Sequence, residues 1–171
     1  PYKNPGNYIR FSETLAKSIV NEHGVLWANQ FDNLSNKKSH YLTTGPEIYK
    51  QLSQKVDAFI CSIGTGGTIS GVSEFLKEKN KNIVIGLADP MGSAMHNFYK
   101  NGKLKSTGSS ITEGIGQGRI TRNLENTVID ESFQVTDTEA LNIVYEMVRK
   151  EGLILGGSSG VNIMGAVKLG K

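Results

Sequence analysis

The chain has 171 residues, of which 37% are hydrophobic, so it is long enough to bury a core and too apolar to be disordered. Lysine and arginine total 19 against 16 acidic residues, a small excess that gives no reason to expect a nucleic-acid partner. A single cysteine, Cys61, excludes an internal disulfide, and three histidines without acidic partners at ligand spacing indicate no metal site. We therefore expect a globular protein of a reducing compartment, by default the cytoplasm.

The ends of the sequence and its apolar runs bear on targeting. No run approaches the roughly 18 apolar residues of a membrane span, and the first residues lack the charged and apolar regions of a signal peptide. The chain begins at Pro1 rather than at Met and ends at Lys171 inside a helical pattern. We expect a piece of a longer protein without a membrane partner.

The first third of the chain predicts a helix, a strand and a second helix. Apolar residues recur at helical spacing from residue 8, and Gly24 is the expected stop. The apolar segment 25–28 is expected to be a short strand. A polar loop then leads to a helix over 42–54, in which Pro46 lies near the first turn, where a missing N–H does no harm.

Strands and helices alternate through the rest of the chain. The continuous apolar run 56–63 is typical of a strand buried on both faces. The further expected elements are a helix over 69–79, a strand over 82–89, a helix over 94–99, a loop over 102–118, a strand over 131–135, a helix capped by Thr136 or Asp137 and ended by Gly152, a strand over 153–155 and a final helix. This alternation predicts an α/β fold, a parallel sheet with helices on both faces.

A glycine-rich loop follows the buried strand. The sequence GTGGT, residues 64–68, stands where a strand ends and a helix begins. Backbone amides and the helix dipole favour an anion at such a junction, and glycines allow a phosphate to approach the backbone. Thr65 and Thr68 can add hydroxyl donors. Alternatively, the glycines only shape a tight turn; a nucleotide P-loop is excluded because the loop contains no lysine.

A dinucleotide site is the rival interpretation of this loop. Gly64 and Gly66 fit the first two glycines of G-x-G-x-x-G, although Ile69 occupies the third glycine position. Asp89, at the end of the next strand, stands where an acid would bind a ribose. The loop alone therefore leaves an NAD-type oxidoreductase domain open.

Two further glycine-rich loops weigh against that rival. GGSSG, residues 156–160, follows another predicted strand, and EGIGQG spans residues 113–118. Because parallel strands end at the same edge of a sheet, we expect Ser158 to lie near residues 64–68. Three such loops at one edge suggest a flat ligand held at several points. The alternative for Ser158 is an ordinary helix N-cap.

Five segments together resemble cysteine synthase, the pyridoxal-phosphate enzyme also called O-acetylserine sulfhydrylase. They are NQFDN (29–33), HYLTTGPEI (40–48), GTGGTISGV (64–72), GSSITEGIGQGRI (108–120) and EGLILGGSSGVNI (151–163). The resemblance implies fold type II of the pyridoxal-phosphate enzymes. It assigns residues 1–25 to part of the small N-terminal domain and residues 26–171 to the large domain, shortened at its C-terminus.

The resemblance also implies the roles of individual residues. The residues that the family uses to hold the phosphate of pyridoxal 5′-phosphate match Gly64, Thr65, Gly66, Gly67 and Thr68. Ser158 matches the serine whose hydroxyl faces the pyridine nitrogen. A neutral hydroxyl leaves the ring a moderated electron sink, which suits loss of a β-substituent. Gly114 matches a glycine that borders the cofactor, and Gln30 a glutamine near the substrate carboxylate.

The family's Schiff-base lysine has no match in this sequence, so we expect no catalytic residue here and no activity from the chain alone. By resemblance, the complete protein forms L-cysteine from O-acetyl-L-serine and sulfide, is a homodimer and binds the C-terminal peptide of serine acetyltransferase. A cystathionine β-synthase, with homocysteine as nucleophile, is one alternative. Another is an inactive remnant that binds a phosphate ligand or a peptide.

Overall fold

The computed structural model describes residues 4, 6–19 and 23–171. Within this part the sheet has three parallel strands, β1 (Ala58–Cys61), β2 (Val84–Pro90) and β3 (Glu131–Val135), in the order β1-β2-β3. Ile60 lies opposite Gly86, and Ala88 lies opposite Phe133. The parallel sheet predicted from the alternating pattern is confirmed.

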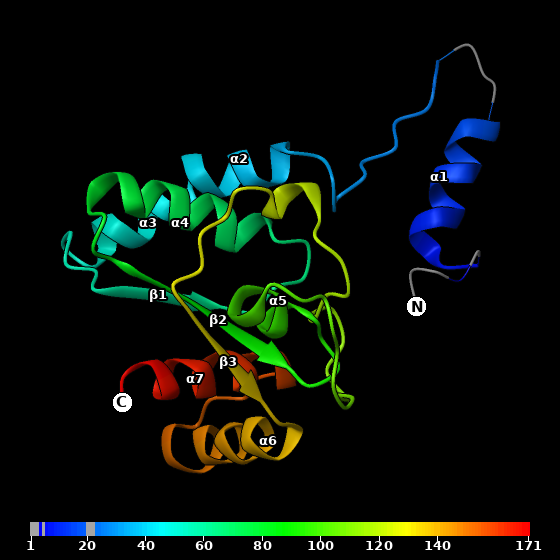
Figure 1. The fold of residues 1–171 in the computed structure, drawn as a ribbon. Coiled ribbons are helices and arrows are strands. Elements are labelled where there is room, and N and C mark those ends of the chain that lie inside the picture. Colours follow the sequence, from blue (N-terminus) through cyan, green and yellow to red (C-terminus); the bar gives the residue numbers. More distant parts are fainter. Residues whose placement is uncertain (1–3, 5, 20–22) are drawn as a thin grey trace.

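One face of the sheet is covered by α4 (Gly67–Lys79) and α5 (Met95–Asn101), with α2 (Ser35–Leu42) and α3 (Thr44–Gln51) packed on α4 (Figure 1). Ile85 and Leu87 of β2 are fully buried on this side. The buried residues that form this core cluster are Val56, Ile63, Ile69, Val72, Leu76, Ile83, Ile85, Leu87, Ala94, Met95 and Leu124. Leu124 belongs to a 3₁₀ turn, η1 (Arg122–Leu124), so the loop before β3 also seals this core.

The opposite face is covered by α7 (Gly157–Leu169), and α6 (Asp137–Glu146) packs outside α7 (Figure 1). A Cβ at Gly165 would collide with Ala88 of β2, so α7 can lie close to the sheet only because this residue is glycine. The N-cap of α6 is Thr136, which forms a capping box with Glu139. Of the two caps expected, Thr136 and Asp137, the structure thus selects the first. A π-type turn (Met147–Glu151) continues α6 and ends at Gly152. Helices on both faces confirm the predicted fold class.

Helix α1 (Tyr8–Ser18) lies apart from these layers (Figure 1). Asn7 caps it by accepting a hydrogen bond from the Ile9 amide at 3.1 Å. The helix ends at Ser18, before the expected stop at Gly24, and residues 20–22 of that predicted helix lie outside the described residues. The division of the chain into domains at residue 25 stays a prediction.

Two expected strands and one expected loop are wrong. Residues 25–28 and 153–155 are not strands, because no segment of the described chain forms a ladder with them. Their apolar side chains face outward: Leu26 is 95% exposed and Ile154 is 89% exposed. Helix α2 forms in a segment that is predicted to be mostly loop. The helix predicted over 42–54 corresponds to α3, which begins at Thr44 and ends at Gln51.

Candidate functional site

The glycine loop 64–68 joins β1 to α4 directly. Gly66 is the N-cap of α4 with φ +89°, a conformation that an L side chain rarely adopts. The first amides of α4 have no intrahelical partner, because the first helical bond runs from Ser70 N–H to the Gly66 carbonyl at 3.1 Å. Donors and the positive end of the helix dipole therefore gather at this loop.

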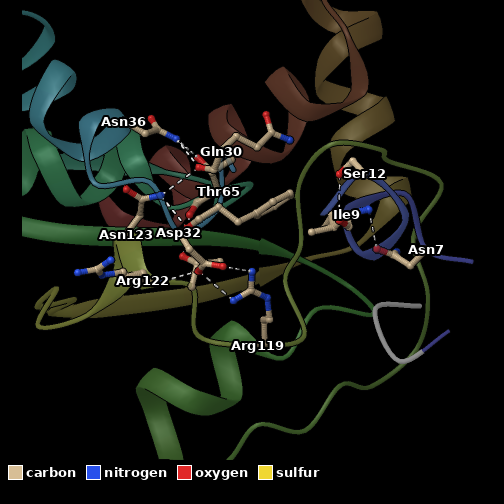
Figure 2. A network of polar contacts seen from close by, with 12 residues as sticks. Asn7, Ile9, Ser12, Gln30, Asp32, Asn36, Thr65, Arg119, Arg122 and Asn123 are labelled. Atoms are coloured by element: carbon tan, nitrogen blue, oxygen red, sulfur yellow. Dashed lines mark hydrogen bonds and ion pairs between the residues drawn. The ribbon is translucent and has the colours of Figure 1, made fainter. Parts of the chain in front are cut away.

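The Thr65 hydroxyl oxygen is the acceptor of two hydrogen bonds. Its Oγ1 accepts hydrogen bonds from Asn36 Nδ2 at 2.9 Å and from Gly67 N–H at 3.3 Å (Figure 2). Asn36 Nδ2 also donates to the Gln30 carbonyl at 3.1 Å, and a carbonyl only accepts, so the amide orientation is determined. With two donors at its oxygen, Thr65 keeps its own hydrogen for a further acceptor.

Thr68, in the first turn of α4, is supported by a histidine. Its Oγ1 lies 3.2 Å from His40 Nε2, and His40 Nδ1 lies 2.9 Å from Thr44 Oγ1. The imidazole thus connects α2, α3 and the start of α4. His40 therefore holds the Thr68 hydroxyl of the loop in place.

The structure brings Gln30 and Thr65 together, because the Asn36 side-chain amide donates both to the Gln30 carbonyl and to Thr65 Oγ1 (Figure 2). The Gln30 side chain is exposed, and its carbonyl accepts from Asn123 Nδ2 at 3.1 Å in addition to Asn36. Asn123 is fully buried and also donates to the Phe31 carbonyl at 2.7 Å. Hydrogen bonds from two side-chain amides therefore hold the backbone at Gln30 and leave its exposed side chain free to reach a ligand.

An ion pair connects the Gln30 segment to the chain that follows the third glycine loop. Arg119 donates from Nη1 and Nη2 to the two carboxylate oxygens of Asp32 at 3.1 and 2.9 Å (Figure 2). The Arg122 amide donates to the same carboxylate at 2.9 Å. Hydrogen bonding from Arg119 lowers the pKa of Asp32 below its usual value.

The third glycine loop lies against the first. A Cβ placed on Gly64 would be 2.5 Å from the Gly114 carbonyl oxygen, so the two backbones are in direct contact. Gly116 N–H donates to the Ile63 carbonyl at 2.8 Å, one residue before Gly64. Gly114 itself has φ +79° and is exposed.

Ser158 is the second residue of α7, and the N-cap is Gly156, so the N-cap interpretation of Ser158 is wrong. Asn162, one turn later, donates to the Ser158 carbonyl at 2.8 Å and accepts from the Ser62 amide at 2.7 Å. A Cβ on Gly157 would lie 3.3 Å from the Thr112 side chain. All three glycine-rich loops therefore meet at the carboxyl end of β1.

Asp89 has a structural role. It is fully buried in β2, and its Oδ2 accepts from the His96 amide at 2.8 Å, near the start of α5. A carboxylate without exposed surface cannot bind a ribose, which removes the acid that the dinucleotide interpretation requires. Its Oδ1 has no hydrogen-bond partner, and burial raises the pKa of Asp89 to about 6.

Asp89 makes stability depend on pH. Its pKa is about 6 in the fold against 3.8 unperturbed, so the native state binds the proton more tightly, and the stabilisation present below pH 3.8 is lost as the pH rises through 6. We therefore compare the free energy of unfolding of the Asp89→Asn variant with that of the parent at two pH values. The difference, variant minus parent, should rise by about 2 kcal/mol from about pH 4 to about pH 7, because only the parent loses stability as Asp89 ionises. Urea unfolding at both pH values measures this difference. A constant difference would contradict the assignment.

Other candidate chemistry is not supported within the described residues. No group of three or more histidine, cysteine or acidic side chains there could hold a metal ion, and no helix there is long and apolar enough to cross a membrane. Burial raises the pKa of the Cys61 thiol to about 12, so it is no nucleophile near neutral pH.

Comparison with known proteins decides between the ligands. The model of the family described as pyridoxal-phosphate dependent enzyme matches residues 5–171. This chain belongs to that family. Cysteine synthase 1 of Neurospora crassa is 45% identical over 99% of the chain and 47% of the relative. Cysteine synthase 1 of Emericella nidulans is 44% identical over 99% of the chain and 48% of the relative.

Solved structures agree with this assignment. An O-acetylserine dependent cystathionine beta-synthase from Helicobacter pylori matches with a TM-score of 0.84 and 32% identity, over 96% of this chain and 51% of that one. The chain therefore shares the fold type II architecture of the pyridoxal-phosphate family. It spans about half the length of the curated relatives it matches, 47% and 48% for the two named above.

The residues present fit the phosphate of the family's cofactor. Residues 62–68 contain hydroxyls, glycines and the first amides of α4, which have no intrahelical partner, but no acidic side chain that would repel a dianion. The Thr65 hydroxyl hydrogen is available to a phosphate oxygen, because two other groups already donate to its oxygen. The chemistry of this donor set therefore suits the phosphate of pyridoxal 5′-phosphate.

Sequence reasoning missed the side-chain amides that hold the glycine-rich loops in place. Asn36 and Asn162 contact residues 29 and 100 positions away in the chain. Neither asparagine stands in a motif with a spacing that predicts its partner. Asp32 lies in the segment NQFDN, but its partner Arg119 lies 87 residues away. Only the folded chain identifies these contacts.

Proposed function

We propose that this chain is part of a pyridoxal-phosphate dependent cysteine synthase. The complete protein replaces the acetoxy group of O-acetyl-L-serine by sulfide to give L-cysteine. The observation that carries the proposal is the meeting of the three loops, represented by Gly64, Gly114 and Ser158, at the end of β1. The fungal cysteine synthases at 45% and 44% identity support the choice of reaction.

Each loop has a separate task in this proposal. The amides at the start of α4, with the hydroxyls of Thr65 and Thr68, hold the phosphate. Ser158 donates a hydrogen bond to the pyridine nitrogen, Gly114 borders the ring, and the exposed Gln30 side chain binds the substrate carboxylate. The cofactor, when bound, supplies an electron sink that permits loss of a β-substituent and addition of a nucleophile.

The ring contact limits how strongly that sink acts. A serine hydroxyl is neutral and gives the nitrogen no counter-charge, whereas a carboxylate would stabilise a protonated ring. The chain therefore favours elimination at the β-carbon over prolonged storage of negative charge at the α-carbon. This agrees with a substitution reaction in which the leaving group departs early.

A second candidate is a cystathionine-forming activity. Cystathionine beta-synthase of Apis mellifera is 36% identical over 99% of this chain and 33% of the relative. The solved structure from Helicobacter pylori is that of an O-acetylserine dependent cystathionine beta-synthase and is 32% identical to the chain. The two candidates share the site and differ in the nucleophile, homocysteine instead of sulfide.

The remaining parts of the proposal concern the complete protein. Residues 62–68, 108–118 and 156–160 contain no lysine, and by resemblance the Schiff-base lysine belongs to a part of the protein outside this chain, which is then inactive by itself. The protein is a homodimer that also binds the C-terminal peptide of serine acetyltransferase. We assign it to the cytoplasm because its single cysteine agrees with a reducing compartment, although one relative is named a putative mitochondrial cysteine synthase.

Ligand binding tests the site. We expect the 171-residue chain to bind inorganic phosphate and, more tightly, pyridoxamine 5′-phosphate, which has an amine in place of the aldehyde and cannot react with surface lysines. Isothermal titration calorimetry measures both, with NAD as the comparison ligand. Binding of NAD, or of neither phosphate compound, would overturn the proposal.

The reaction is tested in the complete protein that contains this chain. We expect cysteine to form from O-acetyl-L-serine and sulfide faster than cystathionine forms when homocysteine is the acceptor. Mass spectrometry of the products compares the two acceptors. Preference for homocysteine would replace the first candidate by the second.

A further inference from the structure

Asn162 makes an arrangement of contacts that the proposed roles of the loops do not use. It lies on α7, half-buried, with its side chain directed at the end of β1. Its Oδ1 accepts from the Ser62 amide at 2.7 Å, and its Nδ2 donates to Ser62 Oγ at 3.2 Å and to the Ser158 carbonyl at 2.8 Å. The amide thus bonds two segments 100 residues apart in the sequence.

The orientation of this amide is determined by its partners. The Ser62 N–H can only donate and the Ser158 carbonyl can only accept, so Oδ1 must face Ser62 N and Nδ2 must face Ser158. All of its hydrogen-bonding groups are engaged on one side of α7. Replacement by a carboxylate would place an acceptor against the Ser158 carbonyl.

The two connected segments hold opposite ends of the proposed ligand. Ser62 stands two residues before Gly64, where the phosphate loop begins, and Ser158 faces the pyridine nitrogen in the proposed function. The short ester arm between the ring and the phosphate limits the separation of the phosphate from the ring nitrogen to a narrow range. A direct connection between Ser62 and Ser158 therefore determines whether both ends can bind at once.

We propose that Asn162 is a positioning residue that holds Ser158 at the correct distance from the phosphate loop. Its side-chain hydrogen bonds go to Ser62 and Ser158, and it acts on the ligand through these two residues. The inference rests on the proposed function, because it requires a ligand that reaches both loops. If the inference holds, Asn162 strengthens the binding of a phosphorylated ring and leaves the binding of phosphate alone unchanged.

General support of the fold does not depend on Asn162. Close packing holds the body of α7, since a Cβ at Gly160 would collide with the Ala140 carbonyl of α6 and one at Gly165 with Ala88 of β2. These contacts lie C-terminal to Ser158 and do not involve the side chain of Asn162. Asn162→Ala should therefore fold, with a local loosening between Ser62 and the first turn of α7.

Calorimetry with two probes tests the proposal on the 171-residue chain. We expect Asn162→Ala to weaken the binding of pyridoxamine 5′-phosphate about tenfold, because the net hydrogen-bond energy lost at this site corresponds to about one decade in Kd. Inorganic phosphate should change less than about twofold, because it occupies only the loop at Gly64. Asn142→Ala, the same replacement on the exposed side of α6, is the matched control and should change neither Kd.

A double-mutant cycle with Ser158→Ala separates positioning from general support. If Asn162 acts through Ser158, the double variant should bind pyridoxamine 5′-phosphate no more weakly than Ser158→Ala does. Additive losses, equal losses for both probes, or no loss for Asn162→Ala would each overturn the inference while the proposed function stands. Failure of the parent chain to bind either probe would overturn both.

Discussion

Gly71→Ala should destabilise the chain strongly, because the added methyl group forces two packed helices apart. A Cβ at this position of α4 would collide with the Lys37 carbonyl of α2 and lie 2.7 Å from the Tyr41 amide nitrogen. Backbone atoms cannot move aside as a side chain can, so the crossing of α2 and α4 must open (Figure 1). Overpacking of this kind costs about 3 kcal/mol, against a gain of about 1 kcal/mol from better helix propensity.

The net loss of about 2 kcal/mol corresponds to a fall in Tm of roughly 4–8 °C for a chain of this size. Thermal unfolding followed by circular dichroism measures it. Gly118→Ala is the control, because nothing lies within 4 Å of a Cβ there. A Tm for Gly71→Ala equal to that of the control would show that α2 does not pack on α4 as described.

Gly64→Ala should have the largest effect on ligand binding. Its Cβ would lie 2.5 Å from the Gly114 carbonyl oxygen, so the first and third loops would separate. A strain of about 1–3 kcal/mol on the bound arrangement weakens the binding of pyridoxamine 5′-phosphate roughly 5- to 150-fold. Calorimetry gives the Kd, and circular dichroism at the same temperature verifies that the variant is folded.

The same Gly118→Ala control applies to binding, since this residue belongs to the third loop but has open space around it. Its Kd should stay within about twofold of the parent. Binding by Gly64→Ala at the strength of the parent would mean that contact between the two loops is not needed for the ligand. The proposed site would then reduce to the start of α4 alone.

The absence of lysine from the three loops separates ligand binding from turnover. Binding of a cofactor analogue depends on Thr65, Ser158 and the backbone of the loops, all of which the chain contains. Turnover needs a lysine that the proposal assigns to another part of the protein. Effects of Gly64→Ala on Kd and on turnover are therefore separate measurements, and only the first depends on this chain alone.

Local sequence pattern determined most of the α/β framework. The apolar runs predict the strands β1 and β2 without any knowledge of their neighbours. The expectation that the run 56–63 forms a strand buried on both faces is wrong for β1, where Ala58 is exposed and the other three residues are half-buried, because β1 lies at the edge of the described sheet. The central strand β2 is the one that is almost wholly buried. Thr136 and Gly152 mark the ends of α6 and its π-type extension for local reasons, a side-chain cap and a left-handed residue. The glycine loop 64–68 likewise predicts an anion site from its own composition.

Tertiary structure decided the elements that need a distant partner. Residues 25–28 and 153–155 are as apolar as strands, but a strand exists only where another strand completes its hydrogen bonds. Helix α2 is too polar to be predicted from periodicity and forms against α4, where Gly71 permits close approach. Ser158 is not an N-cap because α7 begins at Gly157 with Gly156 as its cap.

By itself, the sequence determined the sheet class, the three glycine-rich loops and the residue types that suit a phosphorylated ring. The folded chain alone decided which amides hold those loops together, because Asn36 and Asn162 find partners 29 and 100 residues away. Periodicity and capping act over a few residues and leave a local pattern. A hydrogen bond between distant segments leaves none, since it depends on where the whole fold brings the two groups.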